Sequence, residues 1–281
     1  MENHSTNFKS TIMQLSNKEK NRLKKGFGEW AVITGASSGI GLELTRRVAE
    51  SGINVVLVAR SEGKLQAIAA ELATDYGITT RVIAADVSTP RGLGLVMNIT
   101  KDLPVGLLVL SAGYGTSGSF LKSLVDQETD MLRVNCEAVL VLTQHFAKQF
   151  AEQRRGGIIL MSSIVAFQGV PFAAHYAATK AYVQTLAEGL AKELRPFGVS
   201  VLAAAPGPVT SGFEKRAGLK MSSALKPQEV GVPILKALGK QTTVFPGGLT
   251  KLLITGLRTV PRWGKVSIME KVMRGMTNHQ Q

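Results

Sequence analysis

A tyrosine and a lysine four residues apart, Tyr176 and Lys180, are the most chemically suggestive pair in the chain. Residues at i and i+4 lie on one face of a helix. A free tyrosine has a pKa near 10, and a fixed lysine charge beside it should lower that value. Ser163, at the end of a predicted strand, would hydrogen-bond a substrate oxygen, and Asn135 would order a water beside Lys180. The four side chains predict proton transfer to or from a carbonyl or alcohol oxygen.

A glycine-rich segment upstream predicts a turn that binds phosphate. Residues 34–41 read TGASSGIG, between an apolar strand and a predicted helix. Glycine permits the tight turn, lets the backbone approach a pyrophosphate, and lets the helix pack close to the strand. The free N–H groups at the helix start would then bind the pyrophosphate. The expected contacts are Gly35, Ser37, Ser38, Gly39, Ile40 and Gly41.

The end of the second predicted strand indicates which dinucleotide binds. An acidic residue at this place would hold the ribose 2′-hydroxyl of NAD. The chain has Ala59, Arg60 and Ser61 instead. The Arg60 guanidinium can clamp a 2′-phosphate and stack on adenine, which favours NADP(H). The alternative interpretation is a solvated charge at the strand end.

Strands and helices alternate along the chain. Apolar runs predict strands at 30–34, 54–59, 81–85, 107–110, 157–161, 199–204 and 243–245. Helices are predicted at 17–25, 40–50, 64–76, 127–153 and 173–195. The alternation predicts an α/β fold, a Rossmann-type doubly wound parallel sheet with helices on both faces. We expect a basic N-terminal tail at 1–27, a catalytic domain at 28–246 and a basic amphipathic C-terminal extension at 247–281.

Together, these motifs resemble those of the short-chain dehydrogenase/reductase family. The resemblance is carried by TGASSGIG at 34–41, Asp86, Asn135, Ser163, YAATK at 176–180 and PGPVT at 206–210. It covers about residues 28–246 and implies an NADP-dependent oxidoreductase. It further implies that Asn135, Ser163, Tyr176 and Lys180 form the catalytic tetrad, with Tyr176 as the proton donor in reduction.

The resemblance also implies further cofactor contacts. Asp86 would meet the adenine with Val87 nearby, and Lys180 would hold the nicotinamide ribose close to Tyr176. The remaining implied contacts are Ser111, Ala112 and Gly113, and then Pro206, Gly207, Val209 and Thr210 beside the nicotinamide. One departure concerns the family's Asn-Asn-Ala-Gly, which is LSAG at 110–113 here. Those asparagines support the central sheet, and Ser111 could supply part of the missing hydrogen bonding.

Apolar residues near the predicted catalytic positions indicate the kind of substrate. The expected substrate contacts are Tyr114, Ser163, Ile164, Val165, Phe172 and Tyr176. If they line the cleft, the substrate is largely apolar, such as a fatty acyl chain, a steroid-like ring or a hydrophobic ketone. The alternative is that several of them pack the core.

The net charge of +13 is unevenly distributed. Residues 1–27 contain six lysines and arginines against two glutamates, and residues 247–281 contain six against one. A basic surface favours acidic carriers, anionic lipid and other polyanions, or it only improves solubility. No zinc-finger, RNP or helix-turn-helix pattern predicts nucleic-acid binding. The extension mixes apolar and basic residues and is split by Pro261, so we expect two helices that cover the cleft, contact a second subunit or lie on an anionic membrane.

Other features of the chain exclude some classes of protein. Cys136 is the only cysteine, which excludes a disulfide framework and fits a reducing, cytoplasmic compartment. No uncharged apolar run reaches eighteen residues, so no transmembrane helix is predicted, and peripheral membrane contact stays an alternative. No histidines have metal-ligand spacing, so no metal site is expected. The resemblance implies a homo-oligomer, either a dimer or a tetramer.

The sequence thus predicts an NADP(H)-dependent oxidoreductase that reduces a carbonyl, or oxidises an alcohol, on a largely apolar small molecule. One alternative differs in substrate and is a 3-oxoacyl-thioester reductase of fatty-acid metabolism. Another comes from a different class and is a catalytically silent, NADP-binding regulatory or scaffold protein. The intact tetrad argues against the silent protein, and the departure at Leu110 and Ser111 argues for it.

Overall fold

A parallel sheet organises the computed structural model, which describes residues 13–219 and 224–277. In this part of the chain, seven strands pair in the order β3-β2-β1-β4-β5-β6-β7, all parallel. The strands are β1 (Trp30–Thr34), β2 (Asn54–Ala59), β3 (Thr80–Ala84), β4 (Val105–Leu110), β5 (Gly156–Met161), β6 (Val199–Ala204) and β7 (Thr243–Val244). The order reverses between β1 and β4, which is where such a sheet opens a ligand crevice at its carboxyl ends.

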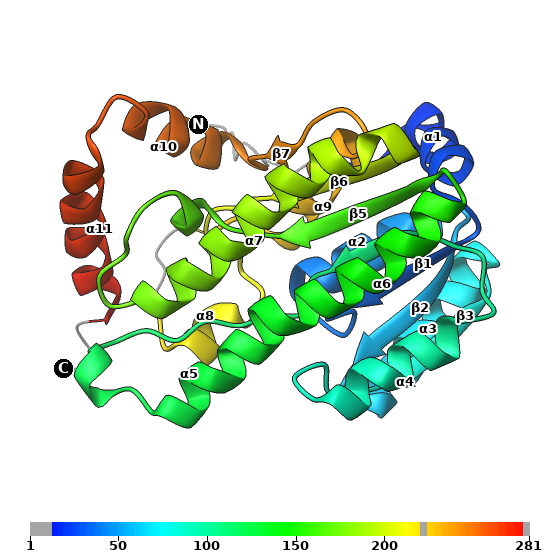
Figure 1. Ribbon diagram of the computed structural model, residues 1–281, viewed down its shortest axis with the longest axis horizontal. Coiled ribbons are helices and arrows are strands. Elements are labelled where there is room, and N and C mark those ends of the chain that lie inside the picture. Colours follow the sequence, from blue (N-terminus) through cyan, green and yellow to red (C-terminus); the bar gives the residue numbers. More distant parts are fainter. Residues whose placement is uncertain (1–12, 220–223, 278–281) are drawn as a thin grey trace, which may run out of the picture.

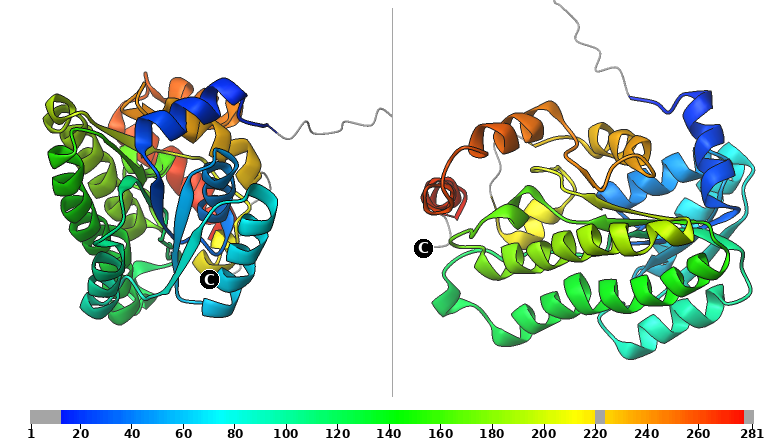
Figure 2. Two further views of the ribbon diagram at one scale, coloured as in Figure 1. Left: turned by 90° about the vertical axis from the view of Figure 1, so that its right-hand side faces the viewer. Right: turned by 45° about the horizontal axis from the view of Figure 1, so that its top comes forward.

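Helices cover both faces of the sheet, as Figures 1 and 2 show. One face carries α1 (Asn17–Phe27), α2 (Gly39–Glu50), α3 (Glu62–Tyr76) and α9 (Pro227–Ala237). The other carries α4 (Pro90–Thr100), α6 (Ala138–Glu152) and α7 (Ala174–Glu193). Successive residues of a strand point to opposite faces of the sheet, so Ile33 packs into the core under α1, α2, α3 and α9, and Val32 packs into the core under α4, α6 and α7. The predicted doubly wound Rossmann-type fold is confirmed.

Two of the helices that cover the sheet, α4 and α9, were not predicted from the sequence. Helix α4 follows Thr89, whose side-chain oxygen accepts a hydrogen bond from the Gly92 N–H at 3.0 Å, and Pro90 occupies its first turn. Proline there is compatible with a helix because that N–H has no helical partner. Helix α9 likewise begins at Pro227. The predicted long helix at 127–153 is present as α5 (Val125–Leu132) and α6, joined by a π-helical turn, η2 (Arg133–Glu137).

The helix predicted near the N-terminus is present and packs against the sheet rather than extending from it. In α1, Leu23 is fully buried in the core. The Arg22 guanidinium donates to the carbonyls of Leu235 and Leu238, both at 2.7 Å, and so ties α1 to the end of α9. Residues 1–12 of the predicted tail lie outside the described part of the chain.

The predicted C-terminal extension forms two helices, α10 (Gly248–Leu257) and α11 (Arg262–Thr277), separated at Pro261. Both lie at the end of the molecule toward which the strands point, opposite α1 (Figure 1). None of the helices in the described ranges combines the length and apolarity needed to cross a bilayer. The division into tail, catalytic domain and extension remains a prediction.

Candidate active site

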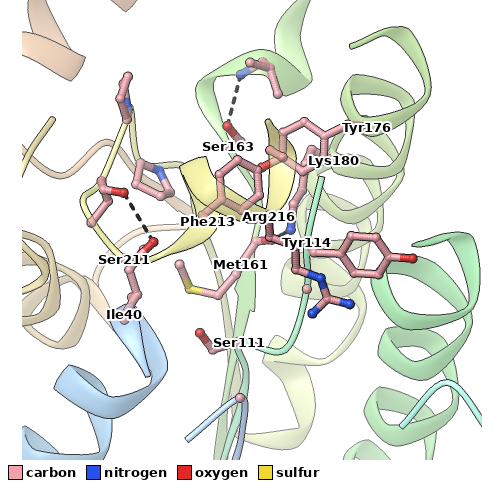
Figure 3. A pocket seen from close by; sticks show the side chains of 18 of the residues that line it. Ile40, Ser111, Tyr114, Met161, Ser163, Tyr176, Lys180, Ser211, Phe213 and Arg216 are labelled. Atoms are coloured by element: carbon pink, nitrogen blue, oxygen red, sulfur yellow. Dashed lines mark hydrogen bonds between the residues drawn. The ribbon is translucent and has the colours of Figure 1, made fainter. Parts of the chain in front are cut away.

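A cavity of about 850 Å³ lies at the carboxyl ends of the strands. It extends from the glycine turn before α2, past Tyr176, to α10 and α11, and Figure 3 shows its central part. Such a volume suits a ligand of drug or cofactor size. The predicted cofactor residues that line it are Gly35, Ser37, Ser38, Gly39, Ile40, Gly41, Arg60, Asp86, Val87, Ser111, Ala112, Gly113, Tyr176, Lys180, Pro206, Gly207 and Val209.

The glycine turn has the geometry that a pyrophosphate requires. Gly35 has φ of 69°, and a Cβ there would lie 2.8 Å from the Ala112 nitrogen. A Cβ at Gly41 would collide with the Gly35 carbonyl oxygen. Ser38 is the N-cap of α2 but makes no capping hydrogen bond with its side chain. The turn is therefore tight, and the helix start that borders the cavity keeps N–H groups for an anionic ligand.

Two cations border the end of the cavity formed by β2 and α3. Arg60 and Lys64 both line it and are exposed, and Ser61 lies between them. At the neighbouring strand end, the Asp86 carboxylate accepts a hydrogen bond from the Ser88 N–H at 3.0 Å, and Val87 is buried. Lys64 was not predicted from the sequence, although its position one turn after a strand-end arginine was a usable signal. A dinucleotide fits this end, and a phosphate on its ribose would find two cations.

Ser163 and Tyr176 meet near the centre of the cavity (Figure 3). Ser163 follows β5 and is buried, and its Oγ accepts a hydrogen bond from the Val165 N–H at 3.4 Å. The Tyr176 ring packs against Phe213 from α8 (Phe213–Ala217), with 5.3 Å between ring centroids. A Cβ at Gly115 would contact both rings, so this glycine lets them approach.

The sequence-based expectation for the Tyr176 pKa is wrong in direction. Burial raises the pKa of the phenol above its ordinary value of 10, and a hydrogen bond with Ser163 lowers it by less. The Lys180 ammonium lies 5.8 Å from the Tyr176 ring centroid and donates instead to the Met161 carbonyl at 2.8 Å. Burial lowers the pKa of Lys180 to about 8. At neutral pH the phenol is therefore protonated and the lysine is mostly charged.

Asn135 lies beside this group but does not line the cavity. It is buried within the π-helical turn, and its amide groups are paired. Its Oδ1 accepts from the Tyr114 N–H at 3.2 Å, and its Nδ2 donates to the Tyr114 carbonyl at 2.8 Å and to the Thr179 hydroxyl at 3.0 Å. Asn135 thus fixes the chain after β4 against α7, which carries Tyr176 and Lys180. This is a positioning geometry, and the predicted water contact stays a prediction.

The segment that departs from the family pattern, after Leu110, is hydrogen-bonded to Thr34 at the end of β1. The Thr34 hydroxyl accepts hydrogen bonds from the backbone N–H groups of Ser111, at 3.2 Å, and Ala112, at 3.1 Å. A threonine side chain therefore joins the ends of the two central strands at the switch point. From the sequence, Ser111 was expected to supply part of this hydrogen bonding, and that role stays a prediction.

The substrate half of the cavity contains most, but not all, of the predicted contacts. Tyr114, Ser163, Ile164, Val165 and Tyr176 line it. Phe172 does not; it has φ of 64°, and its ring lies under the Arg274 guanidinium at 5.1 Å. Thr210, predicted beside the nicotinamide, is exposed outside the lining, and its N–H donates to the Leu225 carbonyl at 2.8 Å.

Further lining residues, outside the predicted substrate contacts, come from later elements of the chain. Phe213, Arg216 and Leu219 belong to α8 and the segment after it, and Arg216 lies 4.0 Å from the Tyr114 ring centroid. Helices α10 and α11 contribute Leu253, Ile254, Leu257, Ile268, Met269, Val272, Met273 and Met276. The helices expected over the cleft, against a subunit or on a membrane therefore cover the cleft. Their methionines give this half a deformable apolar wall.

A doubly wound sheet whose crevice holds a glycine turn and a buried tyrosine–lysine pair defines a dinucleotide-dependent oxidoreductase. The family model for short chain dehydrogenase matches residues 29–221. The chain belongs to this family, whose members bind NAD or NADP.

Relatives and solved structures show what the chain is similar to. A 7beta-hydroxysteroid dehydrogenase of Collinsella aerofaciens is 31% identical over 242 residues, 82% of this chain and 90% of the relative. A very-long-chain 3-oxoacyl-CoA reductase of Debaryomyces hansenii is 33% identical over 227 residues, 76% of this chain and 65% of the relative. A solved structure concerned with 7beta-hydroxysteroid dehydrogenase stereoselectivity has a TM-score of 0.82 at 28% identity, covering 88% and 98% of the two chains. A short-chain dehydrogenase from Sphingobium yanoikuyae in complex with NADPH has a TM-score of 0.74 at 29% identity, covering 82% and 93%.

Proposed function

We propose that the chain is an NADP(H)-dependent reductase of bulky, largely apolar carbonyl compounds. The observation that carries the proposal is the continuity of one cavity. Its nucleotide end has Arg60 and Lys64, its centre has the Tyr176 phenol, and its far end is walled by apolar side chains of α10 and α11. The names of the similar proteins support both the choice of cofactor and the kind of substrate, since one structure is a complex with NADPH and another relative is a hydroxysteroid dehydrogenase.

The proposed chemistry needs a proton donor at the carbonyl oxygen. A nicotinamide cofactor bound in the crevice supplies the hydride for the carbonyl carbon. Tyr176 is protonated at neutral pH because burial raises its pKa, so it can donate its proton to the oxygen as negative charge develops there. Ser163, held by the Val165 N–H, keeps its hydroxyl proton for the same oxygen. The Lys180 ammonium then stabilises the phenolate that remains.

The other predicted residues take supporting roles in this proposal. Asn135 holds the backbone of Tyr114 and the Thr179 side chain of α7. Residues 28–246 would form the catalytic domain, and residues 247–281 the wall of the substrate half. Assembly into a homo-oligomer is proposed from the family alone, and light scattering would measure it.

A second candidate is a 3-oxoacyl-thioester reductase. The similarity to the very-long-chain 3-oxoacyl-CoA reductase of Debaryomyces hansenii favours it, and so does the basic charge near the cavity. A long acyl chain would fit the apolar half, and the phosphates of a thioester carrier would meet the lysines and arginines outside it. A silent NADP-binding protein has less support, because Ser163, Tyr176 and Lys180 all face one cavity.

A substrate panel tests these candidates. Initial rates would be measured with NADPH and with NADH on steroid ketones, bulky aromatic ketones, 3-oxoacyl thioesters of increasing chain length and small polar ketones. The proposal expects NADPH oxidation with the bulky ketones, and a thioester optimum would favour the second candidate. The proposed reductase function would be overturned if only the small polar ketones were turned over, or if NADPH bound without turnover of any substrate.

A further inference from the structure

Large apolar side chains are exposed on the end of the molecule that contains the cavity. They come from two parts of the chain: η1 (Phe120–Lys122) with the start of α5, and the helices α10 and α11. We call this surface the carboxyl-end face and define its apolar part as Phe120, Leu121, Leu124, Val125, Leu252 and Trp263. Leu121 is 95% exposed and Trp263 is 76% exposed. Apolar residues this open, gathered at one end, mark a binding surface.

The two parts of the face are held next to each other. The Gly118 N–H, just before η1, donates to the Phe172 carbonyl at 2.8 Å. The Phe172 ring in turn lies under the Arg274 guanidinium of α11, at 5.1 Å. Figure 1 and the right-hand view of Figure 2 agree, since η1 and the end of α11 lie at the same end of the molecule in both.

The charge of this face is positive. Five exposed basic side chains accompany its apolar residues: Lys122, Lys251, Arg258, Arg262 and Lys271. Four acidic residues lie on the same elements: Glu270 is paired with Arg274 at 2.8 Å, Asp130 accepts a hydrogen bond from the Tyr114 hydroxyl, Glu128 accepts one from the Thr116 hydroxyl, and Asp126 is exposed. Exposed tryptophan and leucine among lysines and arginines are the composition of surfaces that lie in a membrane interface.

The cavity reaches this face. Leu253, Ile268 and Val272 line the cavity and are also 39%, 41% and 42% exposed. They therefore form a rim that joins the apolar interior of the cavity to the apolar outer surface. A ligand that passes this rim would leave one apolar environment for another.

We propose that the carboxyl-end face docks on an anionic lipid bilayer, and that the rim opens toward the acyl chains. A second copy of the chain fits less well, because two such faces would oppose like charges with few carboxylates between them. An acidic protein would match the positive charge of the face, but it would not account for the exposure of the large apolar side chains of Leu121 and Trp263. The use of the rim for substrate rests on the proposed function, whereas docking itself does not.

Vesicle binding by the full chain tests docking without cofactor or substrate. Sedimentation would be compared for vesicles of phosphatidylcholine alone and for vesicles with about one third phosphatidylserine. The chain should bind the anionic vesicles at low salt and be largely released at 1 M salt, where the Debye length is about 3 Å. The chain has two tryptophans, and Trp30 is buried, so a shift of emission to shorter wavelength on binding would report Trp263.

A charge-reversed pair and a matched control locate the contact. Arg262→Glu with Lys271→Glu should weaken anionic-vesicle binding at least about tenfold, since each basic group near such a surface contributes about fivefold to the affinity and two are lost. Lys25→Glu with Lys192→Glu makes the same charge change on exposed residues in the last turns of α1 and α7, at the amino end of the sheet. This control should change binding less than about twofold. Circular dichroism would check that both variants fold.

Three results would overturn docking on a bilayer. They are no binding of the unaltered chain to anionic vesicles, an equal loss in the control pair, and a Trp263 emission unchanged on binding. If the unaltered chain does not bind vesicles but forms a dimer, and Arg262→Glu with Lys271→Glu abolishes that dimer, the face would be assigned to a second copy of the chain. Because turnover of a water-soluble ketone is measured separately, failure of docking leaves the proposed reductase intact, and the reverse also holds.

Discussion

Replacing Lys180 by methionine should make the folded protein more stable at pH 7 while abolishing turnover. Lys180 is 7% exposed, and burial lowers its pKa from the ordinary 10.5 to about 8. At about 1.4 kcal/mol per tenfold change, holding the ammonium in the folded state costs about 3 kcal/mol below pH 8. Methionine has a similar length and no charge, but it leaves the Met161 carbonyl without its donor, a loss of about 1 kcal/mol. The expected net gain is about 2 kcal/mol.

The pH dependence of this gain follows from the direction of the pKa change. Between pH 8 and 10.5 the unfolded chain binds a proton at Lys180 that the folded chain does not, so the stability of the unaltered protein rises through this window. The advantage of Lys180→Met should therefore shrink above pH 8 and vanish near pH 10. Urea denaturation at pH 7 and pH 10, without cofactor, measures both values.

An exposed lysine in the same helix provides the control. Lys192→Met should change the free energy of unfolding by less than about 0.5 kcal/mol at either pH. If Lys180→Met is less stable than the unaltered protein at pH 7, or if its difference is the same at both pH values, the ammonium is not strained by burial and the argument fails.

Three further changes test the proposed site. Arg60→Ala should weaken NADPH binding by about 1.5–3 kcal/mol and leave NADH binding nearly unchanged, because only NADPH has the 2′-phosphate; titration calorimetry with both cofactors decides this. Tyr176→Phe should lower kcat by roughly 10²–10⁴-fold with NADPH binding retained, and normal turnover of the best substrate would refute its role as proton donor. Deleting residues 247–281 removes the wall made by α10 and α11, so KM should rise for long apolar substrates far more than for short ones. A uniform rise would instead indicate a general loss of structure.

The parts of the site that sequence reasoning predicted are local in the chain. The glycine turn at Gly35 and Gly41 and the pair Tyr176 and Lys180 lie within single strand–turn–helix or helical segments. Their spacing alone fixes their relative placement, whatever packs around them. Strand β1 was likewise predicted with its observed bounds, because a short apolar run directly before such a glycine turn is typical of a buried parallel strand.

The parts that sequence reasoning missed depend on tertiary contacts. The Tyr176 pKa was expected to fall because Lys180 is near in sequence, but burial dominates and raises it, and the Phe213 ring of α8 is one of the groups packed against the phenol. Burial of a phenol by a helix that begins at residue 213 has no local signal. Phe172 lies between two site residues in sequence, yet its backbone at φ of 64° belongs to a turn that aims the ring at Arg274.

The π-helical turn that carries Asn135 has a consequence for chain length. The Ala138 N–H bonds to the Arg133 carbonyl, five residues back, so the turn holds one more residue than an α-helix would. Deleting one residue from 133–137 would close the wide turn into a regular α-helix, and the faces of α5 and α6 on either side would keep their surroundings. Met131 should then stay buried and Leu132 stay half-exposed. The change would be confined to the turn itself, where Asn135 contacts Tyr114 and Thr179, so a single-residue deletion here should damage the site while leaving the fold intact.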